Sequence, residues 1–145
     1  MATALRINAA TGAEEVVSVE RPPLEQEKAA LRASINALRD EKKAISPSPV
    51  GPVDSGVEAR LNISGAVQMA QIAMAQGQPF SIDWTLADNS VAEGCDAVAM
   101  IGIGVAAGQH VAACHAVATT LKHAVDAAED YDALDAIDIQ AGWPA

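Results

Sequence analysis

An apolar side chain recurs every seven residues between positions 24 and 45, and this repeat restricts what the segment can form. The segment contains neither Gly nor Pro and is rich in Ala, Leu, Glu, Lys and Arg, so it favours a helix. A seven-residue repeat gathers its side chains in one narrow stripe along such a helix. The stripe consists of Leu24, Leu31, Ile35, Leu38 and Ile45.

Two structures are consistent with this stripe. It can be the oligomerisation seam of a short parallel coiled coil, in which Lys28 and Lys42 occupy two of the remaining core positions. It can equally be the buried face of an amphipathic helix that packs on the rest of the chain. The apolar half of the composition is mostly Ala and Val, and aromatic residues make up only 3%, so the core is thin. Small domains of this kind often associate, and we predict a homotrimer.

The segments around this helix divide the chain into four parts. Residues 1–21 read as an N-terminal β-hairpin that serves for attachment, with turn residues at Asn8 and Gly12. Residues 22–45 form the predicted stalk. Residues 46–53 hold three Pro and one Gly and are predicted to be an extended linker. Residues 54–145 form a C-terminal module.

The C-terminal module reads as helices around one hairpin. A helix capped by Asp54 or Ser55 ends at Gly77, with a break expected near residues 62–65. Alternating apolar residues after Pro79 predict a hairpin whose turn lies at 87–90. One long helix is expected over 95–128, then a short one over 130–136, and the tail should fold back on the long helix. The predicted fold class is mostly α with small β-hairpins.

The long helix also raises the question of a membrane. Residues 97–121 carry no formally charged side chain, and a helix of this length is long enough to span a bilayer. However, Gln109, His110 and His115 interrupt the stretch, and Leu and Phe are scarce in it. We therefore expect a buried helix and no membrane insertion.

Candidate groups for chemistry are few. His110 and Cys114 lie four residues apart on one helix face beside His115, but a zinc site needs more ligands, and His123 and Cys95 have no ligand spacing. A trimer could still bring copies of His110, His115 or His123 to its axis. The acidic residues show no calcium-loop pattern, and no nucleotide-binding or hydrolase motif is present. We expect no enzyme activity and no cofactor.

Charge and targeting narrow the partners further. The formal net charge is −10, which argues against nucleic acid, because phosphate binding needs clustered Lys and Arg. Residues 1–20 lack the basic start and apolar block of a signal peptide.

Several motifs together resemble a known family. They are NISGA from Asn62, WTLADNSV from Trp84, HVAACHA from His110 and AIDIQAGWP from Ala136. They resemble a domain-of-unknown-function family found at the C-termini of bacteriophage tail-fibre and related tail proteins, over about residues 35–144. The resemblance implies association with a phage tail and supplies no catalytic residues.

The resemblance leads to one main functional expectation. The chain is predicted to be a virion structural protein, a short tail fibre or tail-tip protein made in the host cytoplasm, whose partners are its own copies and other tail proteins. The alternative is a tail-fibre assembly factor that leaves before the virion is complete. A small membrane-acting phage protein is a third reading, which rests only on residues 97–121.

Overall fold

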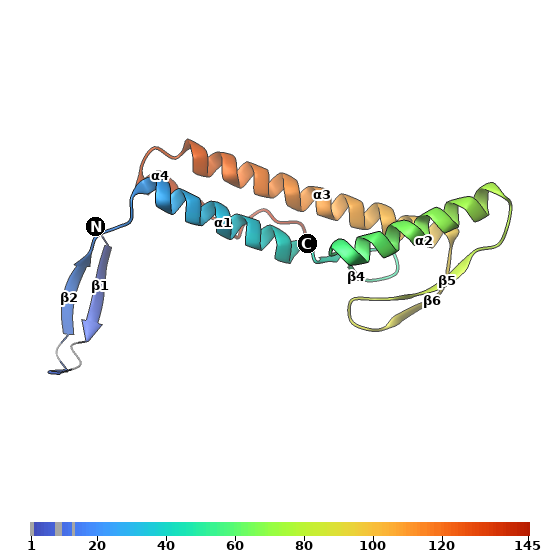
Figure 1. The fold of residues 1–145 in the computed structure, drawn as a ribbon, viewed down its shortest axis with the longest axis horizontal. Coiled ribbons are helices and arrows are strands. Elements are labelled where there is room, and N and C mark those ends of the chain that lie inside the picture. Colours follow the sequence, from blue (N-terminus) through green and yellow to red (C-terminus); the bar gives the residue numbers. More distant parts are fainter. Residues whose placement is uncertain (1, 8–9, 13) are drawn as a thin grey trace.

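The computed structural model describes residues 2–7, 10–12 and 14–145. Four helices and three two-stranded antiparallel pairs make up the described chain, and helix dominates. The predicted fold class, mostly α with small hairpins, is confirmed. Figure 1 shows an elongated molecule, with the helices α1, α2 and α3 running close to its long axis.

The N-terminal hairpin pairs β1 (Ala2–Ile7) with β2 (Glu14–Val19). The register runs from Ala2 opposite Val19 to Ile7 opposite Glu14. The hairpin extends away from the helices at one end of the molecule (Figure 1). Gly12 has a φ of 67°, as expected for its turn, whereas Asn8, the other predicted turn residue, lies outside the described residues.

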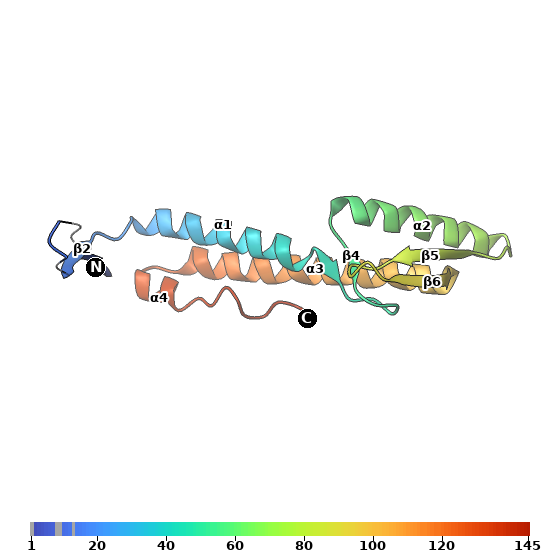
Figure 2. The ribbon, with the colours of Figure 1, turned by 90° about the horizontal axis from the view of Figure 1, so that it is seen from below.

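The helix α3 (Ala97–Ala127) is the long central element to which both other long helices attach. Its 31 residues correspond to about 46 Å. Figure 2 shows α1 (Leu24–Lys42) and α2 (Val57–Ala75) following one another along one side of α3. The expected single long helix is therefore present. The expected break near residues 62–65 is wrong, because α2 runs through them without interruption.

The core consists of two clusters that share α3. One lies between α2 and the first half of α3 and contains Ile63, Met100 and Ile103. The other lies between α1 and the second half of α3 and contains Ile35 and Val125. Ala contributes to both clusters, in keeping with the thin core expected from composition.

The proline-rich segment between α1 and α2 is folded against the body. Its ends, β3 (Ile45–Ser46) and β4 (Val53–Asp54), pair as a two-residue ladder. Ser46 and Ser55 are both fully buried. Ser46 donates from Oγ to Ser55 Oγ at 2.7 Å, and Ser55 donates to the carbonyl oxygen of Lys43 at 2.7 Å. These bonds satisfy buried polar groups and hold the start of α2 beside the end of α1.

The second hairpin joins α2 to α3. Its strands are β5 (Ser81–Thr85) and β6 (Val91–Asp96), with a register shift between Ile82 and Trp84. Ile82 and Trp84 pack on the α2–α3 cluster, so the alternation read from the sequence corresponds to an inner and an outer face. Asp96 then caps α3 by accepting a hydrogen bond from the backbone N–H of Ala99 at 2.8 Å.

The chain ends with α4 (Tyr131–Asp135) and an extended segment. Leu134, Ile137, Ile139 and Trp143 join the cluster around Ile35, so the tail folds back as predicted. Figure 2 shows this segment running beside α3 on the side away from α1.

Candidate interaction surfaces

The predicted seam on α1 lies against other parts of the same chain. Ile35 is completely buried in the cluster with Val125 and Leu134, and Leu24 and Leu31 pack at its edge. Leu38 is half-buried and Ile45 is 50% exposed. The single chain therefore has the second of the two structures considered, an amphipathic helix packed on the rest of the molecule. Association of copies through this seam remains a prediction.

Polar contacts fix the position of α1 along α3. Lys28, which the seam placed in a core position, is buried and donates to the carbonyl oxygen of Asp126 at 3.3 Å, in the last turn of α3. Arg32 forms an ion pair with the Asp126 carboxylate. Lys122 donates to the side-chain oxygen of Asn36 at 2.9 Å. These bonds set the register between the two helices at their shared end.

His110 makes the corresponding contact at the other end of α1. It is buried, and its Nε2 lies 2.9 Å from the carbonyl oxygen of Lys42, the last residue of α1. A carbonyl oxygen can only accept a hydrogen bond, so Nε2 of His110 carries the proton and donates the bond to Lys42. The Sγ of Cys114 lies 3.7 Å from the same nitrogen. Burial raises the pKa of Cys114, so its thiol stays protonated and unreactive. The pair stabilises the fold at the end of α1.

The remaining candidate ligands are not brought together. His115 and His123 are both exposed, whereas Cys95, a residue of β6, is buried. Partial desolvation, followed by the positive charges of Arg39 and Lys43, lowers the pKa of His115. Within the described residues, no three His, Cys, Asp or Glu side chains form a group that could hold a metal ion.

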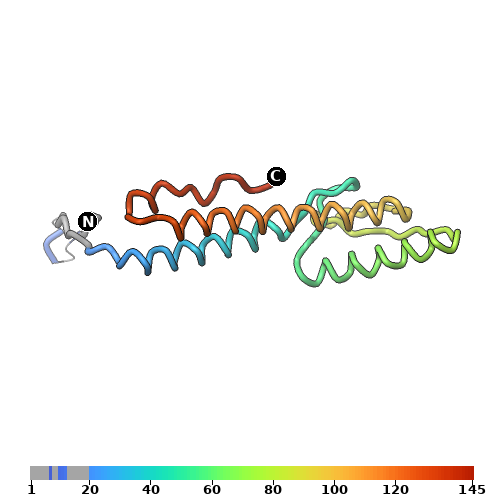
Figure 3. Tube along the Cα trace, turned by 90° about the horizontal axis from the view of Figure 1, so that it is seen from above, coloured from blue at the N-terminus to red at the C-terminus, as the bar shows by residue number. Residues whose placement is uncertain are grey.

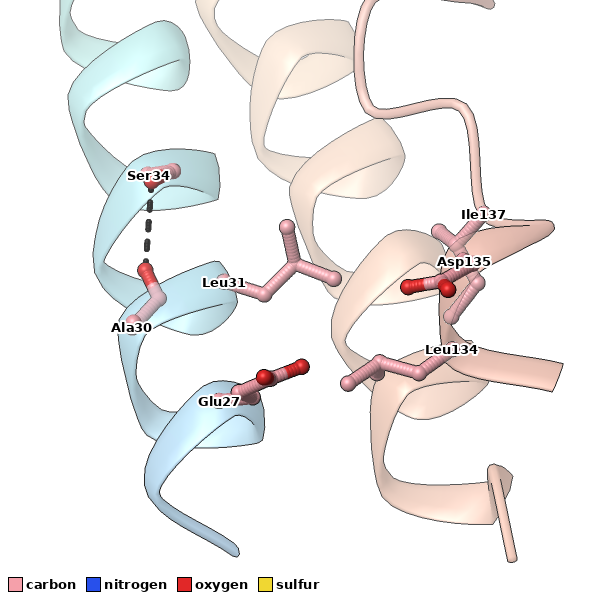
Figure 4. Close-up of a pocket in the computed structure, with 7 residues that line it drawn as sticks. All are labelled: Glu27, Ala30, Leu31, Ser34, Leu134, Asp135 and Ile137. Carbon is pink, nitrogen blue, oxygen red and sulfur yellow. Dashed lines mark hydrogen bonds between the residues drawn. The ribbon is translucent and has the colours of Figure 1, made fainter. Parts of the chain in front are cut away.

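A shallow groove separates α1 from α4, and Figure 4 shows its lining. Leu31 and Leu134 project into it from opposite sides, and Glu27 and Asp135 lie at its edge. Both carboxylates bind Arg21, which donates to Glu27 Oε1 at 2.8 Å and to Asp135 Oδ2 at 3.0 Å. The guanidinium lowers the pKa of Asp135. Both carboxylates that line the groove are therefore ion-paired with the same guanidinium.

Arg21 also ties the N-terminal segment to the end of the chain. Its guanidinium lies 4.3 Å from the ring centroid of Tyr131, and the Tyr131 hydroxyl donates to the carbonyl oxygen of Pro22 at 2.9 Å. Exposed ion pairs contribute little to stability singly, but these contacts converge on one residue. They fix the point at which the hairpin joins the helical body.

A second groove lies between α2 and α3, and its lining includes Arg60. The floor is formed by Val67 and Gly104, where a Cβ on Gly104 would lie 2.7 Å from Val67 Cγ2. The two helices therefore approach each other closely at this glycine. The Nε of Arg60 is buried in the wall and has no hydrogen-bond partner within the described part of the chain. No pattern in the sequence singles out Arg60.

The α3 helix has the length and composition of a membrane-spanning segment. Its most apolar 18-residue window has a mean hydropathy of 1.6, and 33% of that window is buried inside the molecule. The helix α3 is therefore the centre of the fold, and yet much of its apolar surface is not covered by the rest of the molecule.

Comparison with known protein families places the chain. A family described as a domain of unknown function (DUF4376) matches residues 26–140. The chain belongs to the DUF4376 family. No curated protein and no solved structure matches it.

The extent of the match shows which elements belong together. The DUF4376 region begins within α1 and ends in the segment after α4, so it includes both core clusters. The helix predicted as a separate stalk is thus nearly all within the same DUF4376 domain as the C-terminal module. The N-terminal hairpin, residues 2–19, lies outside the match.

Proposed function

We propose that the chain is a structural component of a phage or phage-like tail, a short tail-fibre or tail-tip protein without enzyme activity. The resemblance of its motifs to domains at the C-termini of tail-fibre proteins motivates this proposal. Its localisation is then the virion tail, after synthesis in the host cytoplasm. Its partners are other tail proteins and copies of itself.

The observation that carries the proposal is the arrangement of the hairpin and the helical body. A body built on one helix of about 46 Å holds a β-hairpin at one end, joined through the contacts of Arg21. Among the described strands, β1 and β2 pair only with each other. Their outer edges therefore offer backbone hydrogen bonds to a strand of another protein. An elongated body with an attachment strand pair at one end suits a part that projects from a tail.

The composition of purified particles tests this function. We expect the chain to be present in stoichiometric amount when particles from the encoding phage or prophage are quantified by mass spectrometry. A chain that lacks residues 1–20 should be absent from particles although it is made and folded. A full-length Ile72→Glu variant, altered at an exposed site on α2, is the matched control and should be incorporated.

The second candidate is a tail-fibre assembly factor. The apolar side chains exposed on α2 favour it, because a chaperone needs such a surface to hold its client. Abundance in the producing cell combined with absence from purified particles would establish this candidate and overturn the first.

A further inference from the structure

The outer face of α3 is uncovered along the molecule. Figure 3 shows α3 running between α1 and α2 on one side and the C-terminal segment on the other, and none of the described segments lies in front of it. The exposed side chains on this face recur every seven residues, with two others four residues after members of that series. We define the outer face of α3 by Val98, Val105, Gln109, Ala112, Ala116 and Thr119.

This face has the composition of a buried surface. Val98 is 69% exposed and Val105 is 53% exposed. Residues 97–121 carry no formal charge, and neither do residues 61–82, which run from α2 to the start of β5. A helix that is apolar on all sides is normally covered on all sides. In the single chain, α1, α2, the second hairpin and the C-terminal segment cover other sides of α3, whereas no described segment covers its outer face.

A second copy of the chain is the occupant that fits. The seven-residue repeat is the pattern by which one helix packs along another, and the same repeat on a second copy is complementary to it. Small residues such as Ala112 and Ala116 allow the two backbones to approach closely. Gln109, in the middle of the face, can hydrogen-bond across the pair and fix its register.

Charge favours the same occupant over a membrane or a charged partner. Two chains of net charge −10 repel each other wherever their acidic surfaces meet, and the uncharged outer face lets them approach with the least repulsion. An uncharged face gives a basic partner nothing to pair with. In a lipid bilayer, the polar groups of Gln109 and Thr119 would lose their hydrogen bonds with water, and Lys122 follows directly.

The available surface reaches the lower end of what a specific interface needs. The stretch from residue 98 to residue 121 is about 36 Å long and one helix wide, roughly 10 Å, and the adjoining side of α2 doubles that width along the first half of α3 only. The resulting footprint is on the order of 500 Å² per partner, so that two copies would bury about 1,000 Å² in total. Arg60 lines the groove beside Val105 and adds a cation at the edge of this footprint, where an oxygen atom of the second copy could bind its unpaired Nε.

We propose that copies of this chain associate by packing α3 against α3 through the outer face of α3. The inference rests on the proposed function in that a tail part is expected to self-associate. It assigns the contact to α3 instead of the seam on α1, whose central residue Ile35 is used inside the chain.

Solution mass tests the contact. We expect the purified full-length chain to show a mass that is a multiple of 14.9 kDa by light scattering. The double variant Val105→Glu/Ala112→Glu should fall to the monomer mass, since four or more carboxylates would meet where two outer faces of α3 pack together. The matched control Met69→Glu/Ile72→Glu places the same charges on exposed positions of α2 that do not line the groove beside the outer face, and it should keep the wild-type mass.

Cysteine cross-linking tests the same contact without relying on dissociation. Ala112→Cys lies near the middle of the outer face and should form an intermolecular disulfide under mild oxidation. A disulfide requires Cα atoms about 4.4–6.8 Å apart. Val98→Cys at one end should cross-link only if the two helices run parallel. The wild-type chain is the control and should stay uncross-linked, because Cys95 and Cys114 are buried.

Three outcomes would overturn the proposal: a monomer at every concentration, a wild-type mass retained by the Glu pair, or no cross-link at Ala112→Cys. Binding of a monomer to neutral lipid vesicles would overturn it in favour of a membrane. Circular dichroism at 222 nm confirms that each variant is folded. None of these results decides the presence of the chain in particles, so the proposed function is judged separately.

Discussion

At the scale of single residues, close contacts decide which positions tolerate change. Gly104 allows α2 and α3 to approach, because a Cβ at this position would lie 2.7 Å from Val67 Cγ2, closer than van der Waals contact. Gly65 lies inside α2, and within the described residues nothing lies within 4 Å of where its Cβ would be. The two glycines lower helix propensity equally, but only Gly104 is needed for a close contact between helices.

We predict opposite changes in stability at these two glycines. Gly104→Ala should lower the free energy of unfolding by about 1 kcal/mol, because the overlap with Val67 outweighs the gain in helix propensity. Gly65→Ala should raise it by up to about 1 kcal/mol. Urea unfolding followed by circular dichroism measures both. A gain of similar size at the two positions would show that the α2–α3 contact is looser than described.

Acid titration tests the Arg21 contacts. The guanidinium of Arg21 lowers the pKa of Asp135 below its ordinary 3.8, so the pair stabilises the fold above that pH and the contribution is lost as pH falls through the lowered pKa. Arg21→Gln should raise the pKa of Asp135 toward 3.8, as measured by NMR of its carboxyl carbon. Arg39→Gln, which removes an ion pair with Asp40, is the control and should leave Asp135 unchanged.

At the scale of elements, the main result is that α1 packs on α3 and on the C-terminal segment of its own chain. The sequence predicted the helix and its apolar stripe correctly, but the stripe could not distinguish a second chain from the rest of its own. Contacts such as that of His110 with Lys42 decide the matter, and they join residues 68 positions apart. Similarly, three prolines predicted an extended linker, whereas the buried hydrogen bonds from Ser46 to Ser55 and from Ser55 to Lys43 hold its ends against the body.

Two isoleucines of the same stripe provide a test of this packing. Ile35→Ala should lower the free energy of unfolding by about 2–5 kcal/mol, because Ile35 is completely buried and a cavity remains. Ile45→Ala should cost less than about 1 kcal/mol, because half of that side chain is already exposed to water. Chemical denaturation of the two variants gives the comparison. Equal losses would mean that the whole stripe is covered in the folded protein.

At the scale of the whole molecule, the helical body and the hairpin differ in how they are supported. The body has two hydrophobic clusters joined by α3, whereas β1 and β2, among the described strands, pair only with each other. A lone hairpin is only marginally stable in water. The fold of the body was thus largely predictable from helical periodicity, while the surfaces proposed for association depend on the spatial arrangement of α3 with its neighbours.

Removal of residues 1–20 should therefore leave the body intact. We predict a melting temperature close to that of the full-length chain, since Arg21 and its contacts with Glu27 and Asp135 remain. Thermal unfolding at 222 nm measures it. A marked drop would indicate that the hairpin packs on the helices in solution, which would argue against its role as a free attachment element.

The use of one helix by both clusters has a consequence for how the protein unfolds. Met100 and Val125 lie in different clusters, but both belong to α3. Loss of either cluster removes the packing that stabilises that helix, since helical stability in proteins comes mainly from such packing. The two ends should therefore open together in hydrogen exchange, as one cooperative unit, although about 40 Å of helix separates them.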